Sequence, residues 1–258
     1  MSSQSRVAIV TGGASGIGFA FSQGLAKEGY AVVIADIRGG EEAAARLRET
    51  SADAIGVSVD VTSAADTKAM ARAALDRFGR IDVLINNAGL FTTLALKDFE
   101  QIEPAEWMKV MEVNTLGPFL CAKAVMPSYR EAGGGRIINV ASTSPIKGTP
   151  NMQHYTASKG AVIAFTRSLA RELGSTNVTV NAIAPGFVLT DLTQKLWSDP
   201  TMQAWGRANT PLRRLGKPED MVGAAVFLAS AASAYMTGQV IYVDGGISCG
   251  LQWPIPLT

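Results

Sequence analysis

Three residues with complementary acid–base chemistry lie near the middle of the chain. Tyr155 and Lys159 are four residues apart, and Ser142 precedes the tyrosine by thirteen. Positions i and i+4 share one face of a helix, so the phenol and the ammonium group point the same way. A nearby cation favours phenolate and lowers the pKa of a phenol from its usual value of about 10. The spacing therefore predicts a tyrosine that exchanges a proton with a substrate, whose oxygen the serine holds.

Such a pair also occurs on ordinary surface helices, so the elements around it matter. Short β-branched segments alternate with longer helical patterns along the whole chain. The predicted strands cover 7–11, 31–35, 55–59, 83–86, 136–141, 179–184 and 239–243, and the predicted helices cover 17–28, 39–50, 63–79, 104–130, 152–174 and 218–230. This alternation predicts βαβ units with a parallel sheet. We expect one α/β domain over residues 1–258, a doubly wound Rossmann fold, with an insertion at 190–216 before the last helix.

Composition excludes several classes of function. The net charge is +1 and 17% of the residues are charged, which argues against a nucleic-acid or membrane partner. Cys121 and Cys249 lack metal-ligand spacing, and the single histidine argues against zinc, so we expect no metal site. The apolar segment 7–10 is too short for a signal peptide or a membrane span. These features predict a protein of the reducing cytoplasm.

A glycine-rich turn follows the first predicted strand. Gly12, Gly16 and Gly18 have the spacing G-x-x-x-G-x-G, directly before a helix. Glycines at such a turn let the backbone approach a pyrophosphate, and the helix start offers unpaired N–H groups to it. Many tight turns between a strand and a helix carry glycine for steric reasons alone. The position between strand and helix nevertheless predicts a dinucleotide site.

Asp36 ends the second predicted strand, where a carboxylate accepts hydrogen bonds from an adenosine ribose. A carboxylate there also repels a 2′-phosphate, so we expect NAD(H) as the cofactor. The alternative is that Asp36 caps the helix that begins near Gly39. Arg38 is a complication, because a guanidinium group pairs well with a 2′-phosphate.

These motifs together resemble the short-chain dehydrogenase/reductase family over nearly the whole chain. The matching pieces are Thr11–Gly18, Asp60-Val61, Asn86-Asn87-Ala88-Gly89, Asn114, Ser142, Tyr155, Lys159, Pro185-Gly186 and Thr190. The resemblance implies a seven-stranded parallel sheet in the order 3-2-1-4-5-6-7. It also implies a homotetramer, paired through helices 104–130 and 152–174.

The resemblance implies a role for each catalytic residue. Tyr155 is the general acid or base, Lys159 lowers its pKa and binds the nicotinamide ribose, and Ser142 orients the substrate oxygen. Asn114 holds, through its helix backbone, a water that connects Lys159 to solvent. Pro118, four residues further on, predicts a kink there because a proline ring disrupts helical hydrogen bonding.

The same resemblance implies the contacts of the cofactor. Asp60 and Val61 border the adenine, Asn87, Ala88 and Gly89 the adenosine half, and Ile17 the phosphates and nicotinamide. Pro185, Gly186 and Val188 flank the nicotinamide and Thr190 its carboxamide. The complete set of expected cofactor contacts is Gly12, Ser15, Gly16, Ile17, Gly18, Asp36, Asp60, Val61, Asn87, Ala88, Gly89, Tyr155, Lys159, Pro185, Gly186, Val188 and Thr190.

The substrate is expected to be a small alcohol or carbonyl compound. The resemblance implies a substrate lid near 190–216, which contains Trp197, Met202 and Trp205. The residues expected on the opposite wall of the pocket are Ser144, Phe91, Leu94, Ile146 and Met152. Together they favour a secondary alcohol or ketone with apolar bulk. Asn151, Gln153 and His154 equally suit a sugar or polyol, although for His154 we expect a packing or rim position.

Three alternatives remain. The first is an NADPH-dependent reductase of the 3-oxoacyl carrier-protein type, which usually carries basic residues where Ser15 and Asp36 stand here. The second is a polyol or sugar dehydrogenase. The third is a protein that senses NAD(H) without catalysis, against which the complete set of catalytic residues argues.

Overall fold

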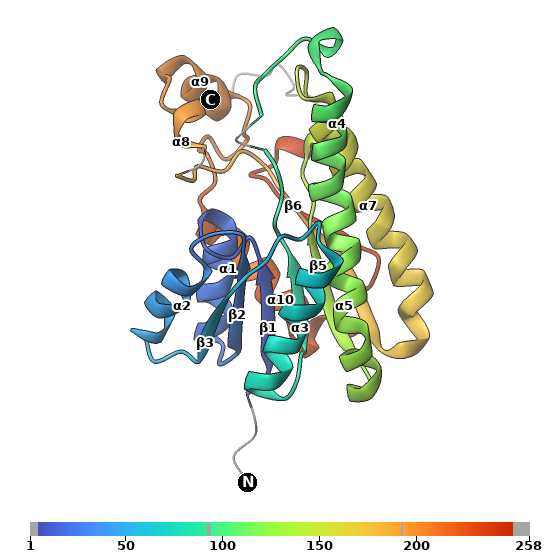
Figure 1. Ribbon diagram of the computed structural model, residues 1–258. Helices are drawn as coiled ribbons and strands as arrows, with labels where there is room; N and C mark the ends of the chain where they lie inside the picture. Colours follow the sequence, from blue (N-terminus) through green and yellow to red (C-terminus); the bar gives the residue numbers. More distant parts are fainter. Residues whose placement is uncertain (1–4, 92–93, 192, 250–258) are drawn as a thin grey trace.

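The protein is a three-layer α/β structure built on one parallel sheet (Figure 1). The computed structural model describes residues 5–91, 94–191 and 193–249. The seven strands lie in the order β3-β2-β1-β4-β5-β6-β7, and every neighbouring pair is parallel. This confirms the predicted fold and strand order.

The strands and helices follow the predicted segments closely, with a few added turns. The strands are β1 (Val7–Thr11), β2 (Ala31–Asp36), β3 (Ala54–Ser58), β4 (Val83–Asn86), β5 (Gly135–Val140), β6 (Val178–Pro185) and β7 (Val240–Val243). The α-helices are α1 (Gly16–Lys27), α2 (Gly40–Arg48), α3 (Ala64–Phe78), α4 (Pro104–Met111), α5 (Gly117–Ala132), α6 (Ser144–Lys147), α7 (Gln153–Leu173), α8 (Gln194–Trp197), α9 (Pro200–Ala208) and α10 (Val222–Ala229).

The sheet buries apolar side chains on both faces, as a parallel sheet covered by helices requires. Val7 and Ile9 of β1 belong to the core under α3, α5 and α7. Ala8 and Val10 belong to the core under α1, α2 and α10. Successive side chains of a strand point to opposite faces, so one uninterrupted apolar segment supplies both cores. Figure 1 shows the two helical layers on either side of the strands.

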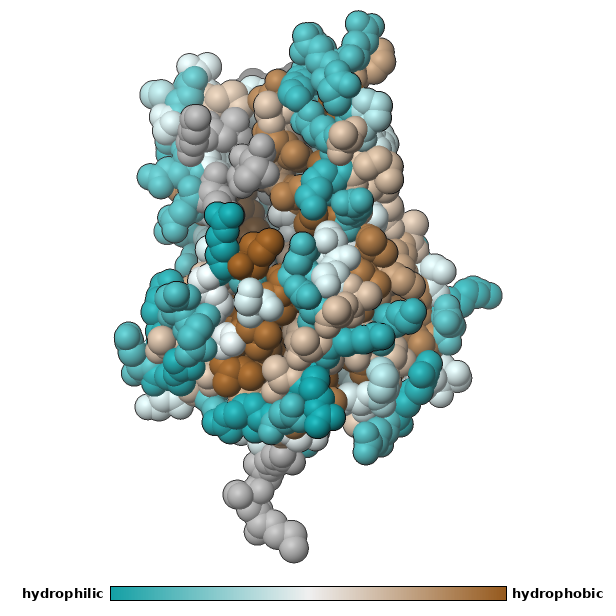
Figure 2. Space-filling view, in the orientation of Figure 1, coloured by the Kyte–Doolittle hydropathy of each residue, from teal (hydrophilic) through white to brown (hydrophobic). Residues whose placement is uncertain are grey.

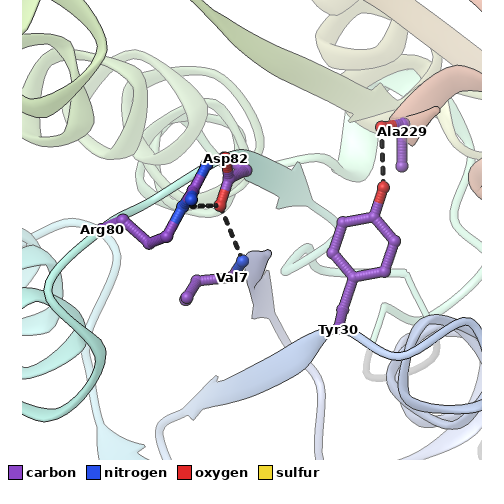
Figure 3. Close-up of polar contacts among 5 residues, drawn as sticks. All are labelled: Val7, Tyr30, Arg80, Asp82 and Ala229. Carbon is purple, nitrogen blue, oxygen red and sulfur yellow. Dashed lines mark hydrogen bonds and ion pairs between the residues drawn. The ribbon is translucent and has the colours of Figure 1, made fainter. Parts of the chain in front are cut away.

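Asp82 and Tyr30 make hydrogen bonds near the amino-terminal ends of the strands, away from the glycine turn (Figure 3). Asp82, just before β4, accepts the N–H of Val7 at 2.8 Å and two hydrogen bonds from Arg80, at 2.9 and 2.6 Å. The Tyr30 hydroxyl donates to the carbonyl of Ala229 at 2.9 Å, which ties α10 to the start of β2. The glycine turn and the predicted catalytic residues lie at the opposite, carboxyl ends of the strands.

A buried chain of polar side chains connects the centre of the sheet to α7. Asn86 Nδ2 donates to Asn139 Oδ1 at 2.9 Å, and Asn139 Nδ2 donates to Thr166 Oγ1 at 2.9 Å. Thr166 in turn donates to the carbonyl of Val162 within the helix. Because all three side chains are buried, each amide needs its partner, and α7 is held in one register over β4 and β5.

The predicted helix over 104–130 contains an irregular turn. Residues Glu112–Leu116 form a π-helix between α4 and α5. Pro118 has no N–H to donate to the carbonyl four residues earlier, which belongs to Asn114, so α-helical bonding fails there. The expected kink at Asn114 is therefore present in the form of a wider helical turn.

The segment predicted as a lid contains two short helices, α8 and α9, which lie beside the carboxyl edge (Figure 1). Asp199 begins α9 by accepting the N–H of Thr201 at 2.7 Å. That this segment closes over a substrate stays a prediction. Among the described residues, none of the helices combines the length and the apolar character needed to cross a membrane.

We predict that Asn139→Ala lowers the free energy of unfolding by about 2 kcal/mol, because it leaves Asn86 and Thr166 buried without a partner. Chemical denaturation measures the change. Asn209→Ala, which removes an exposed hydrogen bond at the end of α9, serves as the control and is expected to stay within about 0.5 kcal/mol. Equal effects of the two substitutions would contradict the role of the buried chain.

Candidate active site

The glycine turn requires glycine for its backbone conformation at Gly12 and Gly16 and for close packing at Gly12 and Gly18. Gly12 and Gly16 have φ values of +60° and +52°, which favour glycine. A Cβ added to Gly18 would lie 2.0 Å from the carbonyl oxygen of Gly12. The start of α1 therefore packs directly against the end of β1, as the spacing predicted.

The start of α1 also leaves hydrogen-bond donors available. Ser15 occupies the N-cap position, but its side chain makes no capping hydrogen bond and is exposed. The first N–H groups of the helix consequently have no side-chain acceptor, and Ile17 lies beside them, half-buried. A Cβ at Gly16 would lie 3.6 Å from Thr190, in the loop that follows β6. The arrangement fits an anionic group of the size of a pyrophosphate.

Asn87 braces the glycine turn from the neighbouring strand end. Its side-chain amide donates to the carbonyls of Thr11 and Gly12 at 3.0 and 2.9 Å. The N–H groups of Asn87 and Ala88 donate to Thr11 Oγ1 at 3.0 and 3.1 Å. The sequence suggested Asn87 only as a cofactor contact; the structure shows that its amide already has two protein partners.

Asp36 lies at the end of β2, beside the turn. One carboxylate oxygen accepts the N–H of Ala14 at 3.1 Å, and the other accepts the N–H of Arg38 at 3.3 Å. The carboxylate is thus oriented by backbone on both sides and does not cap α2, whose N-cap is Gly39. Arg38 is exposed.

Asp60 and Val61 follow β3 and have different surroundings. Asp60 accepts hydrogen bonds from the N–H and the hydroxyl of Thr62 at 2.9 and 2.7 Å, and these bonds lower the pKa of its carboxyl. Val61 is buried, and a Cβ at Gly117 would lie 2.8 Å from it. Whether either residue borders an adenine ring stays a prediction.

The structure brings the predicted catalytic residues together at the carboxyl ends of β4 and β5. Ser142 follows β5 and its hydroxyl lies 3.0 Å from the Ser144 hydroxyl. Tyr155, in the first turn of α7, is buried. Burial raises the pKa of Tyr155 to about 12, and a hydrogen bond with Ser142 acts in the opposite direction. That Lys159 lowers the pKa of Tyr155 stays a prediction, since burial and the Ser142 hydrogen bond account for the shift described here.

Lys159 lies one turn further along α7 and is also buried. Its Nζ donates to the carbonyl of Val140 at 2.8 Å and lies 5.9 Å from the centre of the Tyr155 ring. The ammonium group lies close to Gly89, in the loop after β4, because a Cβ added to that glycine would be 3.4 Å from this Nζ. Burial lowers the pKa of Lys159 to about 8.

Asn114 uses its side chain within the protein. Its carboxamide accepts the N–H of Leu90 at 2.7 Å and donates to the Leu90 carbonyl at 3.2 Å and to Ser158 Oγ at 2.9 Å. The side chain thus clamps the loop after β4 to α7. That the backbone carbonyl of Asn114 holds a water stays a prediction.

The loops after β6 and β7 complete this edge. The carbonyl of Pro185 accepts the N–H of Thr143 at 3.2 Å, and Gly186 donates to Val243 at 3.2 Å. Thr190 exchanges hydrogen bonds with Thr193, whose hydroxyl also donates to the carbonyl of Val188 at 2.8 Å. Pro185, Gly186, Val188 and Thr190 therefore lie along one ordered loop that leads to the lid.

Apolar side chains gather between α4 and the segment that contains α8 and α9 (Figure 2). The Phe91 ring lies 4.9 Å from the Tyr155 ring, and Met152 is buried. Trp197 of α8 is buried against Phe187, at 5.3 Å between rings. Phe187 was not among the residues predicted to contact the substrate, although its position just after Pro185-Gly186 was a usable signal.

His154 lies within the protein, as the packing alternative predicted. The ring is fully buried, and its Nε2 is 3.5 Å from Glu106 Oε1 with an alignment too poor for a hydrogen bond. Glu106 also pairs with Lys97, which lowers the pKa of its carboxyl.

A cavity of about 490 Å³ opens beside Gly16 and Thr190. Its wall includes Phe19, Arg46 and Lys217, and it does not reach Tyr155. It borders the predicted pyrophosphate position from the outside, so it adds nothing to the catalytic set.

These features define a dinucleotide-dependent oxidoreductase site on a Rossmann fold. A family model described as enoyl-(acyl carrier protein) reductase matches residues 12–248. Together with the fold and the relatives described next, this match shows that the chain belongs to the short-chain dehydrogenase/reductase family.

Three relatives illustrate the similarity. A 3-oxoacyl-(acyl-carrier-protein) reductase of Synechocystis is 41% identical over 247 residues, covering 94% of this chain and 96% of that protein. The corresponding reductase of Staphylococcus aureus is 37% identical over 243 residues, covering 93% and 97%. The crystal structure of a gluconate 5-dehydrogenase from Burkholderia cenocepacia, in complex with NADP and tartrate, has a TM-score of 0.90 at 35% identity, covering 95% and 96%.

We predict that Lys159→Met makes the protein more stable at pH 7, by up to about 3 kcal/mol. The pKa of this lysine falls from 10.5 to about 8 on folding, so the folded protein binds fewer protons between these values. Wild-type stability therefore rises with pH in this window, and the variant lacks this rise. The difference between the two proteins should shrink towards zero by pH 10.5 in denaturation curves. A constant difference at both pH values would contradict the buried charge.

Proposed function

We propose that this protein is a nicotinamide-dependent carbonyl reductase whose substrate is a 3-oxoacyl thioester. The observation that carries this proposal is the similarity to relatives named as 3-oxoacyl reductases, and the buried phenol of Tyr155, protonated at neutral pH, suits the reduction because it can supply the proton. A protonated phenol is a proton donor, as reduction of a ketone requires. The relatives named as 3-oxoacyl reductases support this substrate class over the carbinol with apolar bulk expected from the lid residues.

The residues of the site have complementary roles in this proposal. Ser142 donates a hydrogen bond to the ketone oxygen and holds it against Tyr155. Hydride chemistry is what the nicotinamide supplies when bound. Tyr155 gives its proton to the oxygen that becomes a hydroxyl. Lys159, with a pKa near neutral, then returns a proton to the phenolate, and the Asn114 carbonyl holds the water that resupplies the lysine.

Asp36 supports NAD(H) as the preferred cofactor. Its carboxylate is fixed by two backbone N–H groups where a 2′-phosphate would have to lie, and a fixed negative charge repels that phosphate. The exposed Arg38 and the NADP of the Burkholderia cenocepacia structure favour the alternative. We propose that the Asp36 carboxylate has the larger effect on the choice between NADH and NADPH, because hydrogen bonds hold it in place while the Arg38 side chain is exposed.

A second candidate is oxidation or reduction of a sugar acid. It is favoured by the likeness to the gluconate 5-dehydrogenase, whose structure contains tartrate. The paired hydroxyls of Ser142 and Ser144 suit a substrate with several hydroxyl groups. A sensor without catalysis remains the alternative of another class.

We also propose a homotetramer in the cytoplasm. Trp107, Met108, Leu116 and Phe119 are between 37% and 56% exposed on α4, the π-helix and α5, and Ala157 and Ala164 are exposed on α7. A second copy would cover these apolar residues.

The function is tested by steady-state turnover of acetoacetyl-coenzyme A, gluconate and an aryl carbinol with each cofactor. We expect the thioester to give the highest kcat/KM. Tyr155→Phe should lose at least about a thousandfold in kcat, within the range of general acid catalysis, and still bind NADH in a fluorescence titration. Fastest turnover of gluconate would select the second candidate. Turnover that Tyr155→Phe leaves unchanged would reject the proposed chemistry.

For the cofactor, we predict that Asp36→Ala raises the ratio of NADPH to NADH efficiency by about tenfold, the factor that 1.4 kcal/mol gives. Asp36→Asn separates charge from geometry, because the amide oxygen still accepts the Ala14 N–H while the negative charge is gone. Both variants should shift the ratio if repulsion is the cause. A wild-type preference for NADPH would overturn the assignment.

A further inference from the structure

Lys147 lies at the end of a short helix that begins beside the catalytic serine. Helix α6 runs from Ser144 to Lys147, and residues three apart share one face of a helix. The hydroxyl of Ser144 is 3.0 Å from that of Ser142. Lys147 is therefore one helical turn from the residue that contacts Ser142.

The Lys147 side chain reaches the loop after β6. Its Nζ lies 4.4 Å from the centre of the Phe187 ring, two residues beyond Pro185. That ring also lies 5.3 Å from the rings of Trp197 and Trp205, in α8 and α9. The ammonium group consequently lies between the serine loop and the lid, over an aromatic cluster that the lid helps to form.

The charge of Lys147 lacks a partner of its own. Within the described part of the chain it has no carboxylate at ion-pair distance, whereas Lys97 pairs with Glu106 and Arg214 with Asp220. Asp244 is near enough to act on it electrostatically, but its two carboxylate oxygens accept the N–H groups of Gly246 and Ser248. Partial burial lowers the pKa of Lys147, and the charge of Asp244 acts in the opposite direction.

The contact with Phe187 does not replace an anion. A cation over an aromatic ring at an exposed site gains about 0.5–1 kcal/mol, which orients the ammonium group without neutralising it. Lys147 is at the same time exposed, so a ligand can reach it. An oriented and accessible cation without a carboxylate at ion-pair distance, one helical turn beyond Ser144, is suited to bind an anion.

We propose that Lys147 binds an anionic group of the substrate and selects charged over neutral ketones and alcohols. This inference rests on the proposed function in that it concerns the same cleft. The anionic group is either the phosphate of a coenzyme A or phosphopantetheine thioester or the carboxylate of a sugar acid. Both offer oxygens to the same ammonium donor.

Matched pairs of substrates test the proposal. Acetoacetyl-coenzyme A is compared with its neutral N-acetylcysteamine thioester, and gluconate with sorbitol. For Lys147→Gln we expect KM to rise about tenfold for the charged member of the pair that is turned over, with the neutral member within about twofold. Lys147→Arg should restore the charged substrate. Lys68→Gln removes an exposed lysine of α3 and should change neither.

The outcome also separates phosphate from carboxylate, because only the pair that contains the true ligand should respond. Equal loss for charged and neutral substrates, or no loss, would overturn the proposal and leave Lys147 as a packing residue for the lid.

A binding measurement keeps this inference distinct from the proposed function. Tartrate and 4′-phosphopantetheine are titrated calorimetrically into the protein saturated with NADH, without turnover. Binding of either anion that weakens about tenfold in Lys147→Gln and returns in Lys147→Arg supports the anion site even if no thioester is reduced. Turnover of the thioester with anion binding that is indifferent to Lys147 retains the proposed function and rejects the anion site.

Discussion

The carboxamide of Asn139 is the interaction on which the geometry of the site depends. It accepts from Asn86 on β4 and donates to Thr166 on α7, inside the core and away from water. An apolar residue there would let the helix slide, because dispersion contacts are not directional. A buried amide is left unsatisfied by any other register, at a cost of about 1–3 kcal/mol. Tyr155 and Lys159 are therefore placed over the ends of β4 and β5 by a bond near the middle of the same helix.

Burial governs the chemistry of the two titratable residues. Desolvation acts in opposite directions on a phenol and an ammonium group, raising the pKa of Tyr155 and lowering that of Lys159. At neutral pH the phenol is protonated and a lysine with a pKa of about 8 still carries its proton, so the tyrosine can donate a proton and the lysine can resupply it. Comparing only the charges of the two residues would give the opposite direction for the tyrosine.

Several polar residues near the site hold protein segments in place. Asn87 ties the end of β4 to the glycine turn, Asn114 ties the next loop to α7, and Asp36 is anchored to Ala14. These bonds order the loops before any ligand arrives, which reduces the entropy lost on binding. The open donors at the start of α1 and the unpaired ammonium group of Lys147 contrast with them, because these groups retain capacity for a ligand.

The sequence alone indicated the parallel sheet, because the alternation of strands and helices is a local feature, and its motifs indicated the family, whose resemblance implied the strand order. It also indicated the irregular turn at Asn114, since a proline cannot donate to the carbonyl four residues earlier. Only the tertiary structure showed that burial raises the pKa of Tyr155, that the amides of Asn87 and Asn114 are already occupied, and that Lys147 lies over Phe187. Those properties depend on solvent exclusion and on contacts between residues distant in sequence, which no spacing along the chain encodes.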